Sequence, residues 1–163
     1  MEIETLIQTS SNTLDLSYMD LSELPDSILK LDELEELDLT GNLFTCVPIQ
    51  LQSLTKLRNI ILDDNLISEF ECDLSQLHRL SSISVKHNKL ISFTPIFARN
   101  APIITIYLNN NLLQQVPEVL YQHGDLIAYV SKNQFTKETI TQSINRIFRM
   151  SDGYMAHPCI NFC

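Results

Sequence analysis

Few side chains in this 163-residue sequence could carry out chemistry. His87 follows Asp64 by 23 residues and Asp63 by 24, so a fold that aligned such positions would allow an acid–base set. No nucleophile or oxyanion-stabilising group is recognisable beside them, and catalysis needs these groups within reach of one another. We therefore predict that the protein is not an enzyme and has no catalytic residues.

The four cysteines do not form a regular disulfide or metal framework. Cys159 and Cys163 lie near His157, but zinc sites usually carry closer Cys-x-x-Cys pairs and a fourth ligand. Cys46 and Cys72 are expected to be free thiols that pack as small core or surface residues. With only three glycines, the chain also has no glycine-rich phosphate loop. We expect neither a metal nor a cofactor.

The charge of the chain is unevenly distributed. The net charge is −9, with 16 acidic and three basic residues in 1–75 and four acidic and eight basic residues in 76–163. The acidic balance disfavours nucleic acid as a partner. The N-terminal half should therefore attract basic groups of a partner, whereas the C-terminal half should not.

The first dozen residues contain Glu2 and Glu4, with no basic start and no long apolar run. This composition predicts that the chain has no Sec-type signal peptide. No stretch approaches the ~18 consecutive apolar residues that a membrane helix needs. We expect a soluble protein that does not bind membranes, located in the cytoplasm.

The strongest pattern is an internal repeat. Asn42, Asn65, Asn88 and Asn111 are spaced 23 residues apart, and the positions five and three before and two after each of them are apolar. These apolar residues are Leu37, Leu39, Phe44, Ile60, Leu62, Ile67, Ile83, Val85, Leu90, Ile106, Leu108 and Leu113. Alternation over so few residues predicts a short strand with one buried face in each repeat.

Between these predicted strands, apolar residues recur every three or four positions, as in Leu24, Ile28, Leu31 and Leu34. That spacing predicts a helical or 3₁₀ return, which the prolines at positions 25, 48 and 117 would start with their fixed φ. One unit cannot bury its apolar stripe alone, but stacked units can. The periodic asparagine is expected inside, where its amide would satisfy backbone groups at the bend.

These units resemble leucine-rich repeats of the pattern L-x-x-L-x-L-x-x-N-x-L-x-x-L-P over about residues 11–135, some six repeats. The resemblance implies an α/β solenoid, a horseshoe with short parallel strands on the concave face and helical or 3₁₀ returns on the convex face. The fourth return, "FTPIFARNAPI", lacks the proline directly after Phe93 and has Asn100 where leucine is expected, so it is expected to be irregular. Cysteine-rich caps typical of secreted members are missing, so the chain resembles intracellular adaptors or the eukaryote-like effectors of intracellular bacteria.

Both open ends of a solenoid need covers, which we predict within one domain over 1–163. Residues 1–10 would form an N-terminal cap, with Ile3, Leu6 and Ile7 as its apolar lid. Residues 136–150 would form a capping helix with Thr136 as N-cap, leaving 151–163 as a tail. The apolar residues at helical spacing that would cover the sixth repeat are Ile140, Ile144, Ile147 and Phe148. A partner-binding helix is the alternative.

The residues that alternate with the core positions should face the concave side. They form a gradient from carboxylates at the N-terminal end to tyrosines at the C-terminal end, with Ile61, Tyr107 and Tyr129 in one column as apolar anchors. The predicted partner-binding residues are Asp15, Glu36, Asp38, Ile61, Asp63, Asp64, Lys86, His87, Tyr107, Asn109 and Tyr129. A merely solvated sheet with scattered aromatics is the alternative.

We therefore predict a non-catalytic, monomeric protein–protein interaction module that binds a protein partner, with a basic patch, on its concave sheet. It could be a bacterial effector delivered into a host cell without a Sec signal peptide. The alternative is a targeting subunit or inhibitor of a separate enzyme, such as a ubiquitin ligase, a phosphatase or a GTPase.

Overall fold

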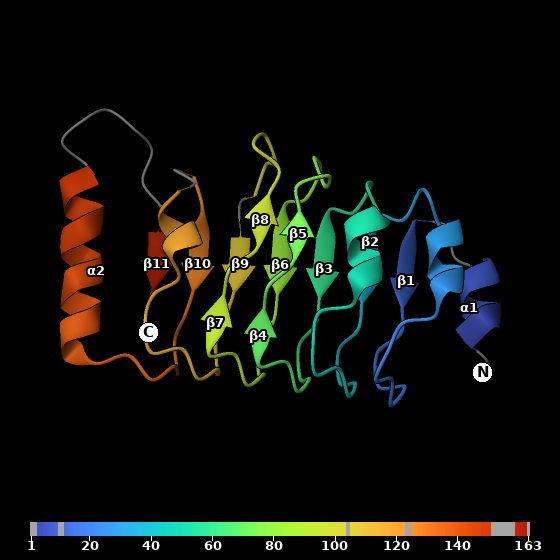
Figure 1. Cartoon of the computed structure of the whole chain (residues 1–163), viewed down its shortest axis with the longest axis horizontal. Coiled ribbons are helices and arrows are strands. Elements are labelled where there is room, and N and C mark those ends of the chain that lie inside the picture. Colours follow the sequence, from blue (N-terminus) through green and yellow to red (C-terminus); the bar gives the residue numbers. More distant parts are fainter. Residues whose placement is uncertain (1–2, 10–11, 104, 123–124, 151–158, 163) are drawn as a thin grey trace.

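The fold is known from a computed structural model, which describes residues 3–9, 12–103, 105–122, 125–150 and 159–162. Its main feature is a parallel sheet of seven short strands that lie side by side along the long axis of the molecule (Figure 1). In spatial order the strands are β1 (Thr13–Asp15), β2 (Glu36–Asp38), β3 (Asn59–Ile61), β6 (Ser82–Ser84), β9 (Thr105–Tyr107), β10 (Ile127–Tyr129) and β11 (Cys159–Asn161).

The strands pair in the register that the repeat predicts. Among the first six strands, each pairing is shifted by 23 residues, as for Thr13 with Glu36 and Glu36 with Asn59, except that the pairing of Thr105 with Ile127 is one residue shorter. The central residue of each of the first six strands is buried, whereas its neighbours point to the other side. The architecture is an α/β solenoid with parallel strands, and it fits the resemblance to leucine-rich repeats.

The periodic asparagines hold neighbouring repeats together. The Asn65 side chain accepts a hydrogen bond from the Phe44 amide at 3.0 Å and donates to the carbonyls of Leu39 at 2.9 Å and Leu62 at 3.2 Å. Asn42, Asn88, Asn111 and Asn133 make the same kind of contact between consecutive repeats. The amide thus replaces backbone partners that are lost where the chain leaves each strand, which confirms its predicted role.

The returns on the opposite side of the solenoid are of two kinds. Three are 3₁₀ helices that directly follow a proline: η1 (Asp26–Lys30), η2 (Ile49–Ser53) and η3 (Glu118–Tyr121). The other two are extended and pair with each other, β4 (Glu69–Phe70) with β7 (Ser92–Phe93) and β5 (Asp73–Leu74) with β8 (Ile96–Phe97). The corresponding position holds Glu71 or Thr94 instead of proline, so no fixed φ starts a 3₁₀ turn there.

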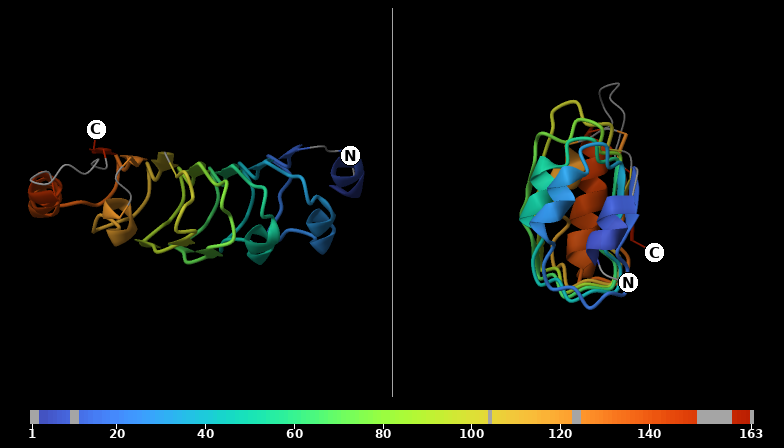
Figure 2. Two further views of the ribbon diagram at one scale, coloured as in Figure 1. Left: turned by 90° about the horizontal axis from the view of Figure 1, so that it is seen from above. Right: turned by 90° about the vertical axis from the view of Figure 1, so that its right-hand side faces the viewer.

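Helices lie at both ends of the stack (Figure 2). At the N-terminal end, helix α1 (Ile3–Thr9) buries Ile7, and Leu6 packs against the core. At the C-terminal end, β11 adds a strand beside β10, and Ile160 and Phe162 pack against the core. Part of the predicted tail is therefore a seventh strand of the sheet.

Helix α2 (Lys137–Met150) begins after Thr136, whose side chain accepts a hydrogen bond from the Thr139 amide at 3.1 Å. The prediction that its isoleucines cover the sixth repeat is wrong for Ile144, which is 41% exposed, whereas Thr139 and Ser143 are buried. The physical reason is that Ile160 and Phe162 already pack against the core at that end. The side chains of residues 147 and 148 lie outside the described part of the chain.

None of the helices in the described residues is long and apolar enough to cross a membrane.

Candidate protein-binding surface

We call the strand face the side of the seven-stranded sheet that is turned away from the 3₁₀ helices (Figure 2). The strand register places one residue from each strand in a row across this face. In order the row reads Asp15, Asp38, Ile61, Ser84, Tyr107 and Tyr129, and β11 extends it with Asn161. The predicted anchors Ile61, Tyr107 and Tyr129 are therefore aligned, although Ser84 separates the first from the other two.

A shallow hollow of about 390 Å³ lies in the middle of the strand face. Five of the predicted residues line it together, whereas the other six lie outside its walls. The five are Glu36, Ile61, Asp63, Lys86 and Tyr107. The hollow thus places an aliphatic and an aromatic side chain beside charges of both signs.

The two tyrosines form a single aromatic unit. The rings of Tyr107 and Tyr129 stack with centroids 4.9 Å apart and an interplanar angle of 8°. Lys86 Nζ lies 5.5 Å from the centroid of Tyr107, within the range of a cation–π contact. Both tyrosines are half-buried in these contacts, so their side chains are held in place before any partner arrives.

Asp63 has an internal role that the sequence did not suggest. It is only 8% exposed, and one carboxylate oxygen accepts hydrogen bonds from the Ser84 hydroxyl at 2.6 Å and the Lys86 amide at 2.8 Å. Its other oxygen lies 2.9 Å from Lys86 Nζ. These groups neutralise and cover the Asp63 carboxylate. Through them Asp63 joins β3 to β6 and positions the Lys86 ammonium near the Tyr107 ring.

The carboxylates at the N-terminal end are more accessible. Asp15 is exposed, and hydrogen bonds from the side chain and backbone of Ser17 lower its pKa below the usual aspartate value. Asp38 is half-buried and accepts a hydrogen bond from the Thr40 amide at 2.8 Å. Glu36 accepts one from the Asn59 side chain at 2.9 Å. These three carboxylates form the acidic end of the strand face.

A second row, just beyond the strand ends, has left-handed backbone conformations with φ between 53° and 67°. In it Asp64, His87 and Asn110 are neighbours: His87 Nδ1 lies 4.0 Å from Asp64, and His87 Nε2 lies 3.2 Å from the Asn110 side chain. Asp64 and His87 are exposed, and Asp63 faces Lys86 instead of His87. The imagined acid–base set is therefore open to water and divided between two rows.

Tyr18, which belongs to the same row, was not among the predicted binding residues. It is 73% exposed, and its ring lies over Gly41, where an added Cβ would come within 2.3 Å of the ring. The only signal in the sequence is the pairing of an aromatic residue with a glycine 23 positions later. Tyr18 adds an accessible aromatic ring at the acidic end.

Asn109 belongs to the row between these two. Its side chain donates a hydrogen bond to the Ser131 hydroxyl at 2.7 Å, and the residue is half-buried. It therefore links the ends of β9 and β10 close to the stacked tyrosines.

The described residues contain no group of three His, Cys, Asp or Glu side chains that could hold a metal ion. Cys46 and Cys159 are exposed free thiols, and Cys72 is buried. Burial is the main cause that raises the pKa of the Cys72 thiol. His157 and Cys163 lie outside the described residues.

No protein-family model matches the chain, and no curated protein matches it. Among solved structures, the chain is similar to a Shigella effector LRR domain, with 18% sequence identity and a TM-score of 0.39. The match covers 98% of this chain and 84% of that chain. At this level the likeness indicates nothing about function, and the architecture rests on the strand register and the asparagine hydrogen bonds.

Proposed function

We propose that the protein is a leucine-rich repeat protein of the 23-residue type and that its strand face binds a protein partner without catalysing a reaction. The observation that carries the proposal is the stacked pair of Tyr107 and Tyr129 beside the central hollow. Aromatic side chains that are already held in place bury a large area at little cost in conformational entropy, which is typical of binding hot spots. Leucine-rich repeat folds are also typically non-catalytic.

The charge of the strand face favours a partner with a basic patch. Asp15, Glu36 and Asp38 lie at one end of the row, whereas the aromatic pair lies at the other. A partner would then place Lys or Arg over the acidic end and an apolar group over the tyrosines. Complementary charge mainly accelerates association, so raised salt should slow binding more than it speeds dissociation.

The decisive experiment is affinity capture followed by mass spectrometry, with the wild type beside the double variant Tyr107→Ala, Tyr129→Ala. Loss of two hot-spot residues should lower the affinity for the partner by roughly 30-fold or more, so that the partner is no longer captured. The matched control is Ile49→Ala, Ile96→Ala, which removes two apolar side chains that are 66% and 60% exposed on the side of the returns. Circular dichroism checks that the tyrosine variant is folded. If the folded variant captures the same partner as the wild type, the proposal fails.

A role as an effector in a host cell is the more specific form of the proposal. Its support is compositional, from the Ser-, Asn- and Gln-rich spacers between the repeats. Fusion to a reporter enzyme that works only inside host cells tests it during infection by the source organism. Reporter signal that needs the specialised secretion system would support delivery, whereas no signal would contradict it.

A further inference from the structure

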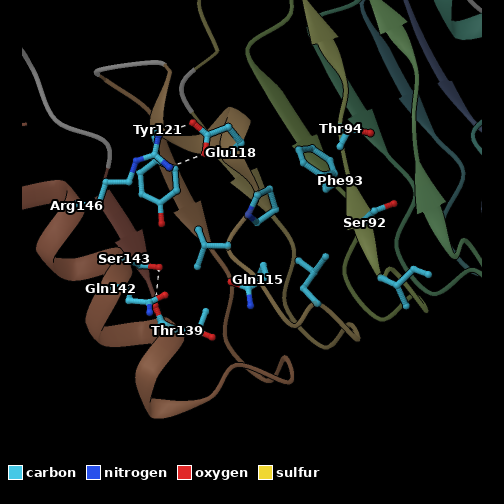
Figure 3. Close-up of a pocket in the computed structure, with 14 residues that line it drawn as sticks. Ser92, Phe93, Thr94, Gln115, Glu118, Tyr121, Thr139, Gln142, Ser143 and Arg146 are labelled. Atoms are coloured by element: carbon cyan, nitrogen blue, oxygen red, sulfur yellow. Dashed lines mark hydrogen bonds and ion pairs between the residues drawn. The ribbon is translucent and has the colours of Figure 1, made fainter.

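A second cleft formed by described residues lies away from the strand face, between α2 and the fourth and fifth returns (Figure 3). Its volume is about 550 Å³, within the ~300–1,000 Å³ that is usual for ligand sites. None of the eleven predicted binding residues lines it. Its existence follows from the orientation of α2, which turns the small polar side chains of Thr139 and Ser143 toward the body and leaves a gap.

Tyr121 supplies the first sign of a ligand. The residue is only 6% exposed, and its ring lies under the Arg146 guanidinium at 4.1 Å. No group in the described part of the chain forms a hydrogen bond with its hydroxyl, which points toward Ser143 and Gln142 across the cleft (Figure 3). A hydroxyl that lines the cleft and has no partner among the described residues can donate to and accept from a ligand there.

The second sign is the open edge of β7. This strand pairs with β4 on one side, and no strand among the described residues pairs with its other side. Residues 91–94 line the cleft, so the unpaired backbone edge belongs to its wall. Free strand edges bind extended peptides by main-chain hydrogen bonds.

The charges of the cleft favour an uncharged ligand. Its only charged side chains, among the residues described, are Glu118 and Arg146, and these form a two-point ion pair with each other. The hydrogen bond from Arg146 lowers the pKa of Glu118, so both groups are ionised and compensate one another at neutral pH. The remaining polar groups are hydroxyls and the amides of Gln115 and Gln142, which can both donate and accept.

We propose that this cleft binds an uncharged, extended peptide segment of a protein partner, which adds a strand to the free edge of β7. The Tyr121 hydroxyl and the amides of Gln115 and Gln142 hydrogen-bond to its main chain, and an apolar side chain of the segment packs on Phe93 and Val116. The site is separate from the strand face and stands whether or not that face binds a partner.

The probe is an array of heptapeptides that are acetylated at the N-terminus, amidated at the C-terminus and made only of uncharged residues. Each peptide is compared with two charged versions, in which two residues are replaced by Asp or by Lys. Fluorescence anisotropy of the best binder with the full chain then compares variants. Tyr121→Phe keeps the ring under Arg146 and removes only the hydroxyl, so it should weaken the peptide about three- to ten-fold. The matched control, Tyr18→Phe, removes a tyrosine hydroxyl on the strand face and should leave affinity unchanged.

A second measurement keeps the result independent of folding. Because the hydroxyl has no partner among the described residues, Tyr121→Phe should leave the urea midpoint of unfolding unchanged or raise it. A lowered midpoint would show that the hydroxyl is already satisfied and would overturn the proposal. Three further results would overturn the proposal. Uncharged peptides could bind no better than charged ones, or Tyr121→Phe could leave the peptide affinity unchanged. The protein could also bind maltoheptaose and none of the peptides.

Discussion

At the bends after β2, β3, β6, β9 and β10, one asparagine amide replaces three or more missing backbone partners. Asn65 is 4% exposed and bonds backbone groups of its own repeat and of the preceding one. No other side chain of similar size offers an acceptor and two donors in the same positions except glutamine, which is longer. Interior asparagines are therefore a condition of the fold and not candidates for recognition.

We expect Asn65→Ala to lower the free energy of unfolding by roughly 3 kcal/mol, because it leaves buried backbone groups without partners. Urea unfolding followed by circular dichroism measures the change. Asn109→Ala is the matched control, since its half-exposed side chain bonds only the Ser131 hydroxyl, and it should cost less than about 1 kcal/mol. Equal losses in the two variants would contradict the structural role of the interior asparagines.

The cysteines differ in the accessibility that decides thiol reactivity. Cys72 is buried and its pKa is raised, whereas Cys46 is exposed. Since the thiolate is the reactive form, iodoacetamide at pH 8 should modify Cys46 rapidly and Cys72 only after unfolding. Peptide mass spectrometry after timed quenching measures both, with the protein in urea as control. Similar rates for the two thiols in the folded protein would contradict this prediction.

Among the elements, α2 makes its described side-chain contacts with the body mainly through polar groups. Arg146 pairs with Glu118 and lies over Tyr121, and the side chains of the ion pair are 45% and 62% exposed. Exposed ion pairs contribute little, about 0–1 kcal/mol. Helix α2 should consequently open locally without unfolding of the solenoid.

We expect Arg146→Ala to accelerate amide hydrogen exchange in α2 by up to about five-fold and to leave exchange in β2 and β3 unchanged. Mass spectrometry of peptic peptides reports the two regions separately. Glu33→Ala breaks another surface pair, with Lys56 at 3.7 Å, and should leave α2 unaffected. Faster exchange throughout the sheet of the Arg146 variant would show that α2 is part of the cooperative unit.

The same contact makes the docking of α2 dependent on pH. The pKa of Glu118 is lowered in the folded protein, so the pair contributes fully above the ordinary glutamate pKa and is lost as the pH falls through the lowered value. Protection of α2, corrected for intrinsic exchange rates, should therefore decrease on acidification. In Glu118→Gln this decrease should disappear; if it persists, another group is responsible.

At the scale of the whole molecule, each repeat contacts only its neighbours, so position along the stack decides how a change spreads. Ile83→Ala removes a fully buried side chain from the central strand and should destabilise the whole protein by about 2–5 kcal/mol. Ile160 lies in the last strand, so Ile160→Ala should mainly accelerate amide hydrogen exchange in β10 and β11. Hydrogen exchange distinguishes the two, and identical exchange patterns would contradict a nearest-neighbour solenoid.

The two ends of the molecule also differ in charge, which bears on recognition. The accessible carboxylates of Asp15, Glu36 and Asp38 belong to the acidic half, whereas the peptide cleft is formed by the basic half and contains only a compensated ion pair. Binding at the strand face should thus depend strongly on salt, whereas binding in the cleft should not. This difference allows the two proposed sites to be told apart in one protein.

The periodic part of the structure could be predicted from the sequence. The 23-residue spacing, the alternating apolar positions and the repeated asparagines are local patterns, and each repeat meets the same neighbours as the last. The row from Asp15 to Tyr129 follows from that register, so the composition of the strand face was predictable as well. That this surface binds a protein partner with a basic patch stays a prediction.

The features that break the period were decided only by the tertiary structure. The extended third and fourth returns, the seventh strand β11, the polar docking of α2 and the ion pair of Asp63 with Lys86 each depend on which residues meet across the stack. Amphipathic spacing in α2 predicted a covering helix, but spacing alone could not show that Ile160 and Phe162 already occupy that end. A sequence pattern states which face of an element is apolar, whereas only the packed structure decides what that face meets.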